Sequence, residues 1–104
     1  MITLAIRYTI NPNKLADFKE YVAAELEPIR QSGGNVLGYF LPTEFAGPTN
    51  EALGLIDIPN LAEYEKYRKA LAEDPAHKKN AVRLEQSGVV LATNRSLIHR
   101  YEKS

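Results

Sequence analysis

Two hydrophobic periods alternate along the chain, one typical of strands and one typical of helices. Between residues 2 and 10 every second side chain is apolar, which predicts a strand with one apolar face. Asn11-Pro12-Asn13 ends it, because proline cannot donate to a strand ladder. Apolar residues then recur every three or four positions over residues 13–31, which predicts an amphipathic helix ended by Gly33-Gly34. The predicted apolar stripe of this helix consists of Leu15, Phe18, Val22, Leu26 and Ile29.

The second part of the chain contains a hairpin, a long helix and a last strand. Gly47-Pro48-Thr49-Asn50 is typical of a turn, and Asn60 is a good helix cap three residues before Glu63. Strict alternation in the first hairpin strand would place Leu37 and Tyr39 on one face. The predicted elements are strands over residues 36–45 and 51–58, a helix from residue 61 to about 86 that is restarted or bent at Asp74-Pro75, and a strand over residues 94–101.

This order, β-α-β-β-α-β, predicts an α+β ferredoxin-like fold. Hairpin pairing and right-handed crossovers favour an antiparallel four-stranded sheet with the first and third strands in the middle and both helices on one face. The chain has 104 residues, which suits a single core, so we expect one domain over residues 1–104.

The predicted sheet is apolar on both faces, although the helices cover only one of them. In the third strand Leu53 and Leu55 alternate with residues that are themselves small or apolar. A sheet apolar on both faces needs a layer on each side. We therefore expect a homodimer through the uncovered sheet face, closed into a dimeric α/β barrel. Arg7 lies on this face and serves either in an ion pair in the dimer, with Asp57 as the candidate partner, or as a ligand anchor.

Charge and composition narrow the kinds of partner. Thirteen basic side chains balance thirteen acidic ones, so the basic excess of a nucleic-acid-binding protein is missing. No apolar run approaches the length of about 20 residues that a membrane-spanning helix needs. The first residues lack the basic and apolar regions of a signal peptide, so we expect a cytoplasmic protein. The chain has no cysteine, which excludes disulfides, thiolate nucleophiles and iron–sulfur clusters.

Neither a metal nor a cofactor is expected from the motifs. The two histidines form no helical ligand pair, and Glu25 and Glu27 do not face each other on a helix, so a metal site is not predicted. The glycines are not spaced as a dinucleotide or phosphate loop. His77 lies beside two lysines near a helix start, which favours a solvated surface position over a role in a site.

Gly54 is the most informative glycine, because it lies in the middle of a strand and leaves space above the sheet. The space is filled either by a side chain, with Phe18, Tyr64 and Tyr67 as candidates, or by a small ligand.

If a ligand occupies that space, strand parity brings Tyr8, Gly54, Ile56 and His99 to the same side of the sheet. These four residues are the predicted ligand-binding residues. The catalytic residues are unknown, and Tyr8, His99 and Arg68 are the weak candidates for an acid, a base or an anion anchor. The alternative is that His99 is a half-buried histidine whose ring is hydrogen-bonded to a neighbouring residue.

The chain resembles the NIPSNAP family, within the dimeric α/β-barrel superfamily. It departs from the family pattern at Gly54-Leu55-Ile56, where relatives often have His-Leu-Trp, and at Ile6, where they often have arginine. A site built on those side chains would be absent or altered here. The resemblance covers nearly the whole chain and is carried by Arg7–Leu15, Gly38–Phe40, Gly47–Glu51, Leu61–Glu63, Arg68, Ala70–Ala72 and Asp74-Pro75.

The resemblance implies a homodimeric ferredoxin-like fold without an agreed activity. The wider superfamily includes cofactor-free monooxygenases that oxidise polycyclic aromatic compounds between sheet and helices. Three hypotheses follow. The first is a homodimer that binds a small apolar or aromatic molecule. The second is a cofactor-independent monooxygenase or isomerase. The third is a structural or protein-interaction dimer without a ligand, because one fold hosts many functions.

Overall fold

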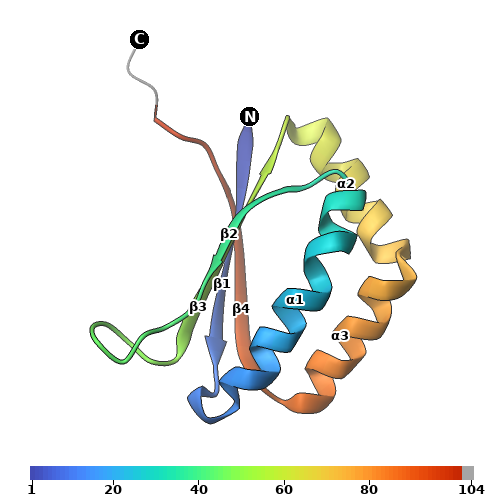
Figure 1. The fold of residues 1–104 in the computed structure, drawn as a ribbon. Helices are drawn as coiled ribbons and strands as arrows, with labels where there is room; N and C mark the ends of the chain where they lie inside the picture. Colours follow the sequence, from blue (N-terminus) through green and yellow to red (C-terminus); the bar gives the residue numbers. More distant parts are fainter. Residues whose placement is uncertain (102–104) are drawn as a thin grey trace.

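The computed structural model describes residues 1–101 and contains a four-stranded antiparallel sheet with all helices on one face (Figure 1). The strand order is β2-β3-β1-β4, which confirms the predicted ferredoxin-like topology. The elements are β1 (Ile2–Ile10), the short 3-10 helix η1 (Pro12–Lys14), α1 (Leu15–Gln31), β2 (Asn35–Phe40), β3 (Glu51–Ile58), α2 (Leu61–Glu73), α3 (Pro75–Ser87) and β4 (Val90–Ile98).

Local side-chain caps define where α2 and α3 begin. The Asn60 side chain accepts a hydrogen bond from the Glu63 N–H at 2.9 Å, and the Asp74 side chain accepts one from the His77 N–H at 3.0 Å. Asp74 has extended backbone angles and Pro75 is the first residue of α3, so the helical run is broken there. The predicted restart at Asp74-Pro75 is therefore confirmed, and it gives two separate helices.

The first hairpin strand is shorter than predicted and is irregular. β2 ends at Phe40 rather than at residue 45, and Pro42 follows shortly, where it cannot donate to the ladder. The register shifts between Val36 and Gly38. Because of this bulge, Val36 and Tyr39 both lie on the helix side, and the simple alternation predicted for this strand is wrong.

The last strand begins and ends earlier than predicted. Gly88 ends α3 with a positive φ of 69°, which lets the chain turn directly into β4. In the ladder Ile98 pairs with Thr3, and β1 begins one residue before Thr3. The bounds predicted for this strand, residues 94–101, are therefore wrong at both ends, because its end depends on the length of β1.

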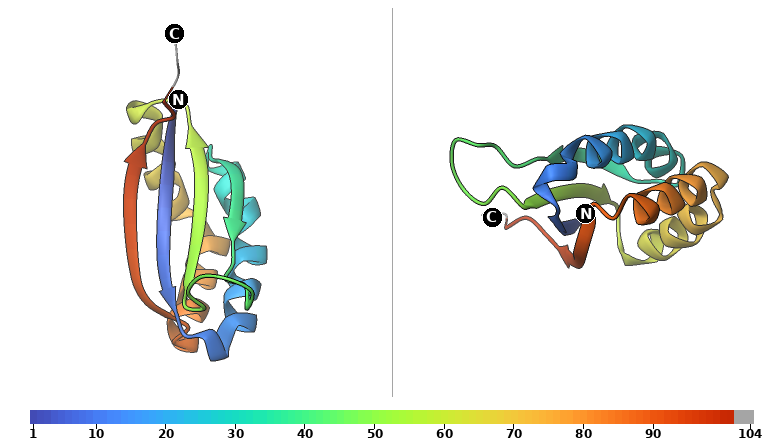
Figure 2. Two further views of the ribbon diagram at one scale, coloured as in Figure 1. Left: turned by 90° about the vertical axis from the view of Figure 1, so that its left-hand side faces the viewer. Right: turned by 90° about the horizontal axis from the view of Figure 1, so that it is seen from below.

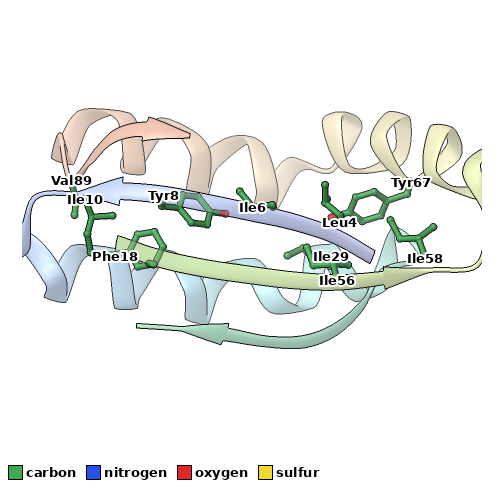
Figure 3. Packing of buried hydrophobic residues seen from close by; sticks show 11 residues of the cluster. Leu4, Ile6, Tyr8, Ile10, Phe18, Ile29, Ile56, Ile58, Tyr67 and Val89 are labelled. Atoms are coloured by element: carbon green, nitrogen blue, oxygen red, sulfur yellow. The ribbon is translucent and has the colours of Figure 1, made fainter. Parts of the chain in front are cut away.

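The core lies between the sheet and the helices (Figure 3). Even-numbered residues of β1 and β3 face the helices, and Phe18 and Ile29 of α1 meet them with at most 1% of their surface exposed. One position of the predicted α1 stripe is wrong. Leu26 is 42% exposed, whereas Glu25 is buried in its place.

The other face of the sheet carries no helix (Figure 2). Leu53 and Leu55 point to this open face, as predicted. Arg7 pairs with Leu53 in the ladder, whereas Asp57 lies opposite Thr3, whose hydroxyl donates to it at 2.6 Å. The register therefore separates Arg7 from Asp57 within one chain, and the ion pair across a dimer stays a prediction.

Candidate functional site

A cavity of about 230 Å³ lies between the sheet and the helices. Its floor is made by apolar side chains of β1 and β3, and its walls combine aromatic, acidic and basic groups from the helices and from both edge strands. The residues that line it are Leu4, Ile6, Tyr21, Glu25, Ile29, Tyr39, Ile56, Tyr64, Tyr67, Arg68, Leu71, Ala72, His77 and Arg95. Apolar walls with a few placed polar groups are typical of small-molecule sites.

A larger hollow of about 590 Å³ lies across the sheet from this cavity, at one end of the open face. Arg7, Phe40, Leu53 and Asn94 are among its lining residues. It is a broad depression on an uncovered sheet. The smaller cavity between the layers contains the buried titratable groups and is therefore the better candidate for chemistry.

Aromatic side chains form the walls of the cavity. Tyr64 and Tyr67 of α2 stack with their ring centroids 6.4 Å apart, and the Arg68 guanidinium carbon lies 6.0 Å from the Tyr64 ring. Tyr39 reaches in from β2, because the bulge in that strand turns it toward the helices. A planar apolar molecule would therefore meet ring faces and edges here.

Glu25 of α1 is a buried carboxylate in this wall, with only 2% of its side chain exposed. Three donors from two helices bind it. The His77 Nδ1 atom lies 2.7 Å from Oε2, the Tyr21 hydroxyl lies 3.2 Å from the same oxygen, and the Asn80 amide donates to Oε1 at 3.3 Å. Asn80 also donates to the Tyr21 carbonyl at 3.0 Å. Burying a carboxylate is costly unless it is hydrogen-bonded, and these contacts meet that need.

Burial also sets the chemistry of the tyrosines around the cavity. It raises the pKa of Tyr21, Tyr39 and Tyr67 well above the ordinary value of a phenol, and it raises that of Tyr8 as well. These side chains are therefore neutral hydroxyls at physiological pH. They can donate hydrogen bonds to a ligand, but they cannot act there as preformed phenolate bases.

Two of the predicted ligand-binding residues lie at or beside the cavity. Ile56 is fully buried and lines it. Tyr8 is on the helix side as predicted, packed edge-on against Phe18 with ring centroids 5.0 Å apart. Its hydroxyl points along β1 toward Ile6, which lines the cavity (Figure 3). The candidate Arg68 is also a lining residue.

The other two predicted residues do not line this cavity. A Cβ on Gly54 would lie 2.7 Å from the Tyr39 ring, so the space above Gly54 is occupied by a side chain. The occupant is Tyr39 from the neighbouring strand and none of the side chains expected to fill it. His99 lies beyond the end of β4, exposed, in a depression with Thr3 and Asp57. The ladder pairs Tyr8 with Thr93 and Thr3 with Ile98, so His99 lies near the other end of β1 and the expectation that it joins Tyr8 is wrong.

Glu25 and Asn80 were not predicted as site residues, and the prediction for His77 was wrong. Only 25% of the His77 side chain is exposed, so the predicted solvated surface position is wrong. One signal was present in the sequence. Glu25 lies three positions after Val22 and four before Ile29, and a charged residue within an apolar stripe indicates a buried partner.

Neither a metal centre nor a membrane-spanning helix is found in the part of the chain that the structure describes. Within residues 1–101 no three histidine, aspartate or glutamate side chains are close enough together to hold a metal ion. The helices of the same residues are too short or too polar to cross a bilayer.

The strand order and the one-sided helix layer define the fold class as α+β ferredoxin-like. Within that class, the NIPSNAP family model matches residues 4–102. The chain therefore belongs to the NIPSNAP family. A comparison with curated proteins found no match.

Solved structures agree with this assignment. Atu4242 from Agrobacterium tumefaciens, a NIPSNAP family protein with unknown function, has a TM-score of 0.85 and 18% identity, over 100% of this chain and 91% of that one. An uncharacterised NIPSNAP domain protein from Burkholderia xenovorans has a TM-score of 0.82 and 18% identity, over 97% and 95% of the two chains. SnoaB from Streptomyces nogalater, a cofactor-independent oxygenase, has a TM-score of 0.65 and 17% identity, over 98% and 94%. At these identities the likeness establishes the fold alone.

Proposed function

We propose that the chain binds a small apolar molecule with one aromatic ring in the cavity between sheet and helices, and that it does so as a homodimer. The cavity carries this proposal. Its volume is about 230 Å³, and a closed apolar cavity of about 150 Å³ holds one benzene ring. One ring with short substituents therefore fits within this volume.

The open sheet face supports the homodimer. Phe40 and Ile98 are each about half exposed there, and Leu53 and Leu55 lie between them on the central strand β3. The loop over residues 41–50 projects from the end of the sheet on the side away from the helices, and its Phe45 is 88% exposed (Figure 1). Exposed apolar side chains on an uncovered sheet face favour an interaction surface, and a second copy of the same sheet is the simplest cover.

A cavity-filling variant tests ligand binding. Ala72 of α2 lines the cavity at an exposed edge, so Ala72→Leu should narrow the cavity without disturbing the core. Ala70→Leu is the matched control, because Ala70 is exposed on the same helix outside the cavity wall. We expect a one-ring aromatic compound such as phenol to shift the NMR signals of cavity residues in the wild type and in Ala70→Leu, with at least about tenfold weaker binding in Ala72→Leu.

Equal binding by the two variants would place the compound elsewhere. An absence of binding by phenol and by a series of similar compounds would favour the third hypothesis, a dimer without a ligand.

A cofactor-independent oxygenase is the second candidate, and the Glu25–His77 pair favours it. Chemistry on an aromatic ring without a cofactor needs a base that can remove a proton from the substrate. His77 lines the cavity, whereas of the residues first expected to act there only Arg68 does. Oxygen consumption with a hydroxylated one-ring aromatic compound tests this candidate. Binding without oxygen consumption would assign the protein to ligand binding alone.

A further inference from the structure

We infer that Glu25 and His77 form a proton-accepting pair, and that the ligand of the cavity carries a weakly acidic hydroxyl group, as in a phenol or an enol. This inference rests on the proposed ligand cavity and specifies the chemistry of its occupant. No motif suggested the pair, since its two residues are 52 positions apart in the chain.

The contact between the two side chains fixes the form of the imidazole. A carboxylate only accepts hydrogen bonds, so the Nδ1 atom, 2.7 Å from the Glu25 oxygen, carries a hydrogen. In the neutral ring Nε2 then carries the lone pair. No partner binds Nε2 in the part of the chain that the structure describes, and both residues line the cavity. One ring nitrogen donates to a buried carboxylate, and the other has a lone pair that can accept a proton. This is the arrangement of a general base.

The surrounding backbone holds the imidazole in place. His77 lies in the first turn of α3, where its N–H donates to the Asp74 cap at 3.0 Å. Asn80 lies one turn further on the same side of α3 and donates both to Glu25 and to the Tyr21 carbonyl of α1. The two Asn80 contacts tie α3 to α1 beside the pair. The imidazole is therefore already held in one orientation before a ligand binds, and binding does not have to restrict its motion.

The proton transfer itself is simple. The hydroxyl O–H bond of the ligand breaks, a bond forms between that proton and Nε2, and the electron pair stays on the ligand oxygen. The other ring hydrogen stays bonded to Nδ1 and keeps its hydrogen bond to the Glu25 carboxylate, which stabilises the imidazolium. Arg68 and Arg95 also line the cavity, so their positive charge favours the resulting anion.

4-Nitrophenol is a direct probe, because its phenolate absorbs in the visible range and its neutral form does not. The measurement is made at a pH at which the free compound is mainly neutral. 4-Nitroanisole is the matched compound, since it has a methyl group in place of the acidic proton. We expect bound 4-nitrophenol to show the phenolate band and to bind at least about tenfold tighter than 4-nitroanisole, because a charge-assisted bond is added.

His77→Gln keeps a donor for Glu25 and removes the base. It should lose the phenolate band and bind both compounds with the affinity that the wild type has for 4-nitroanisole. His99→Gln is the matched control at the exposed histidine, and it should behave as the wild type. Glu25→Gln should also lose the band while keeping 4-nitroanisole binding. If the Glu25→Gln protein does not fold, the test of the proton transfer rests on His77→Gln alone.

Three results would overturn the inference, and they are distinguishable. Equal binding of the two compounds without a phenolate band refutes the proton transfer and leaves the cavity proposal standing. A band that persists in His77→Gln assigns the anion to the arginines instead. Binding of neither compound by the folded wild type refutes both the inference and the proposed function.

Discussion

Tyr39 covers Gly54, so a single methyl group added at position 54 should destabilise the fold. The new Cβ would lie 2.7 Å from Cε1 and 3.0 Å from Cζ of the Tyr39 ring. Contacting carbon atoms normally stay about 3.5–4.0 Å apart, so the ring has to move by roughly an ångström. Overpacking of this kind costs about 1–3 kcal/mol. We expect a loss of about 1 kcal/mol for Gly54→Ala and about 3 kcal/mol for Gly54→Leu.

Gly38→Ala is the matched control in the neighbouring strand. The nearest atom to its Cβ would be Cζ of Phe40 at 3.1 Å, which is the far end of a side chain that is 53% exposed. That ring can swing into solvent. Neither glycine has a positive φ, so backbone strain does not distinguish them. We therefore expect Gly38→Ala to change stability by no more than about 0.5 kcal/mol.

Urea unfolding at one protein concentration measures these differences, because a homodimer makes the midpoint depend on concentration. A double-mutant cycle identifies the cause. In a Tyr39→Leu background the clash is relieved, and Gly54→Ala should cost about 1 kcal/mol less than in the wild type. A Gly54→Ala protein as stable as the wild type, or a cycle without coupling, would refute the reasoning that Tyr39 occupies this space.

Two further predictions concern alkaline pH and the open sheet face. Burial raises the pKa of four tyrosines, Tyr8, Tyr21, Tyr39 and Tyr67. The unfolded chain therefore releases these protons first, and stability should be complete below about pH 10 and then fall by up to about 1.4 kcal/mol per pH unit for each tyrosine. A urea midpoint that does not fall above about pH 10 contradicts this. Leu55→Asp should split or unfold the homodimer, because it buries an unpaired charge, whereas Leu61→Asp, at a position 60% exposed on α2, should not. Sedimentation of the wild type as a single chain contradicts the homodimer.

The order of the elements could be predicted because its signals are local. Residues 2–10 alternate without a break, and the Asn60 cap and the Asp74-Pro75 restart each depend only on neighbouring residues. Given the elements, handedness and hairpin pairing leave few topologies, and the observed strand order is the predicted one. The fold class therefore required no knowledge of long-range contacts.

The strand ends could not be predicted in the same way. The apolar run at residues 89–92 is as compatible with a strand as residues 94–101, and the choice between them depends on pairing with β1. The bulge near Leu37 is likewise fixed by the partner strand β3. A shift at a strand end changes which residues reach the site, and for this reason the prediction for His99 was wrong.

The candidate site required tertiary information of a different kind. A glutamate on the buried side of α1 is unfavourable by itself, so the position of Glu25 makes sense only with donors from another helix. The break at Asp74-Pro75 supplies them, since it ends α2 and starts α3, whose first two turns present His77 and Asn80 to α1. The local signal for the break could be recognised in the sequence. That the break brings His77 and Asn80 to Glu25 could not be predicted, because the sequence alone does not show which helices pack together. A buried acid on an amphipathic helix is therefore a reason to examine the polar residues at the start of every other helix before assigning them to the surface.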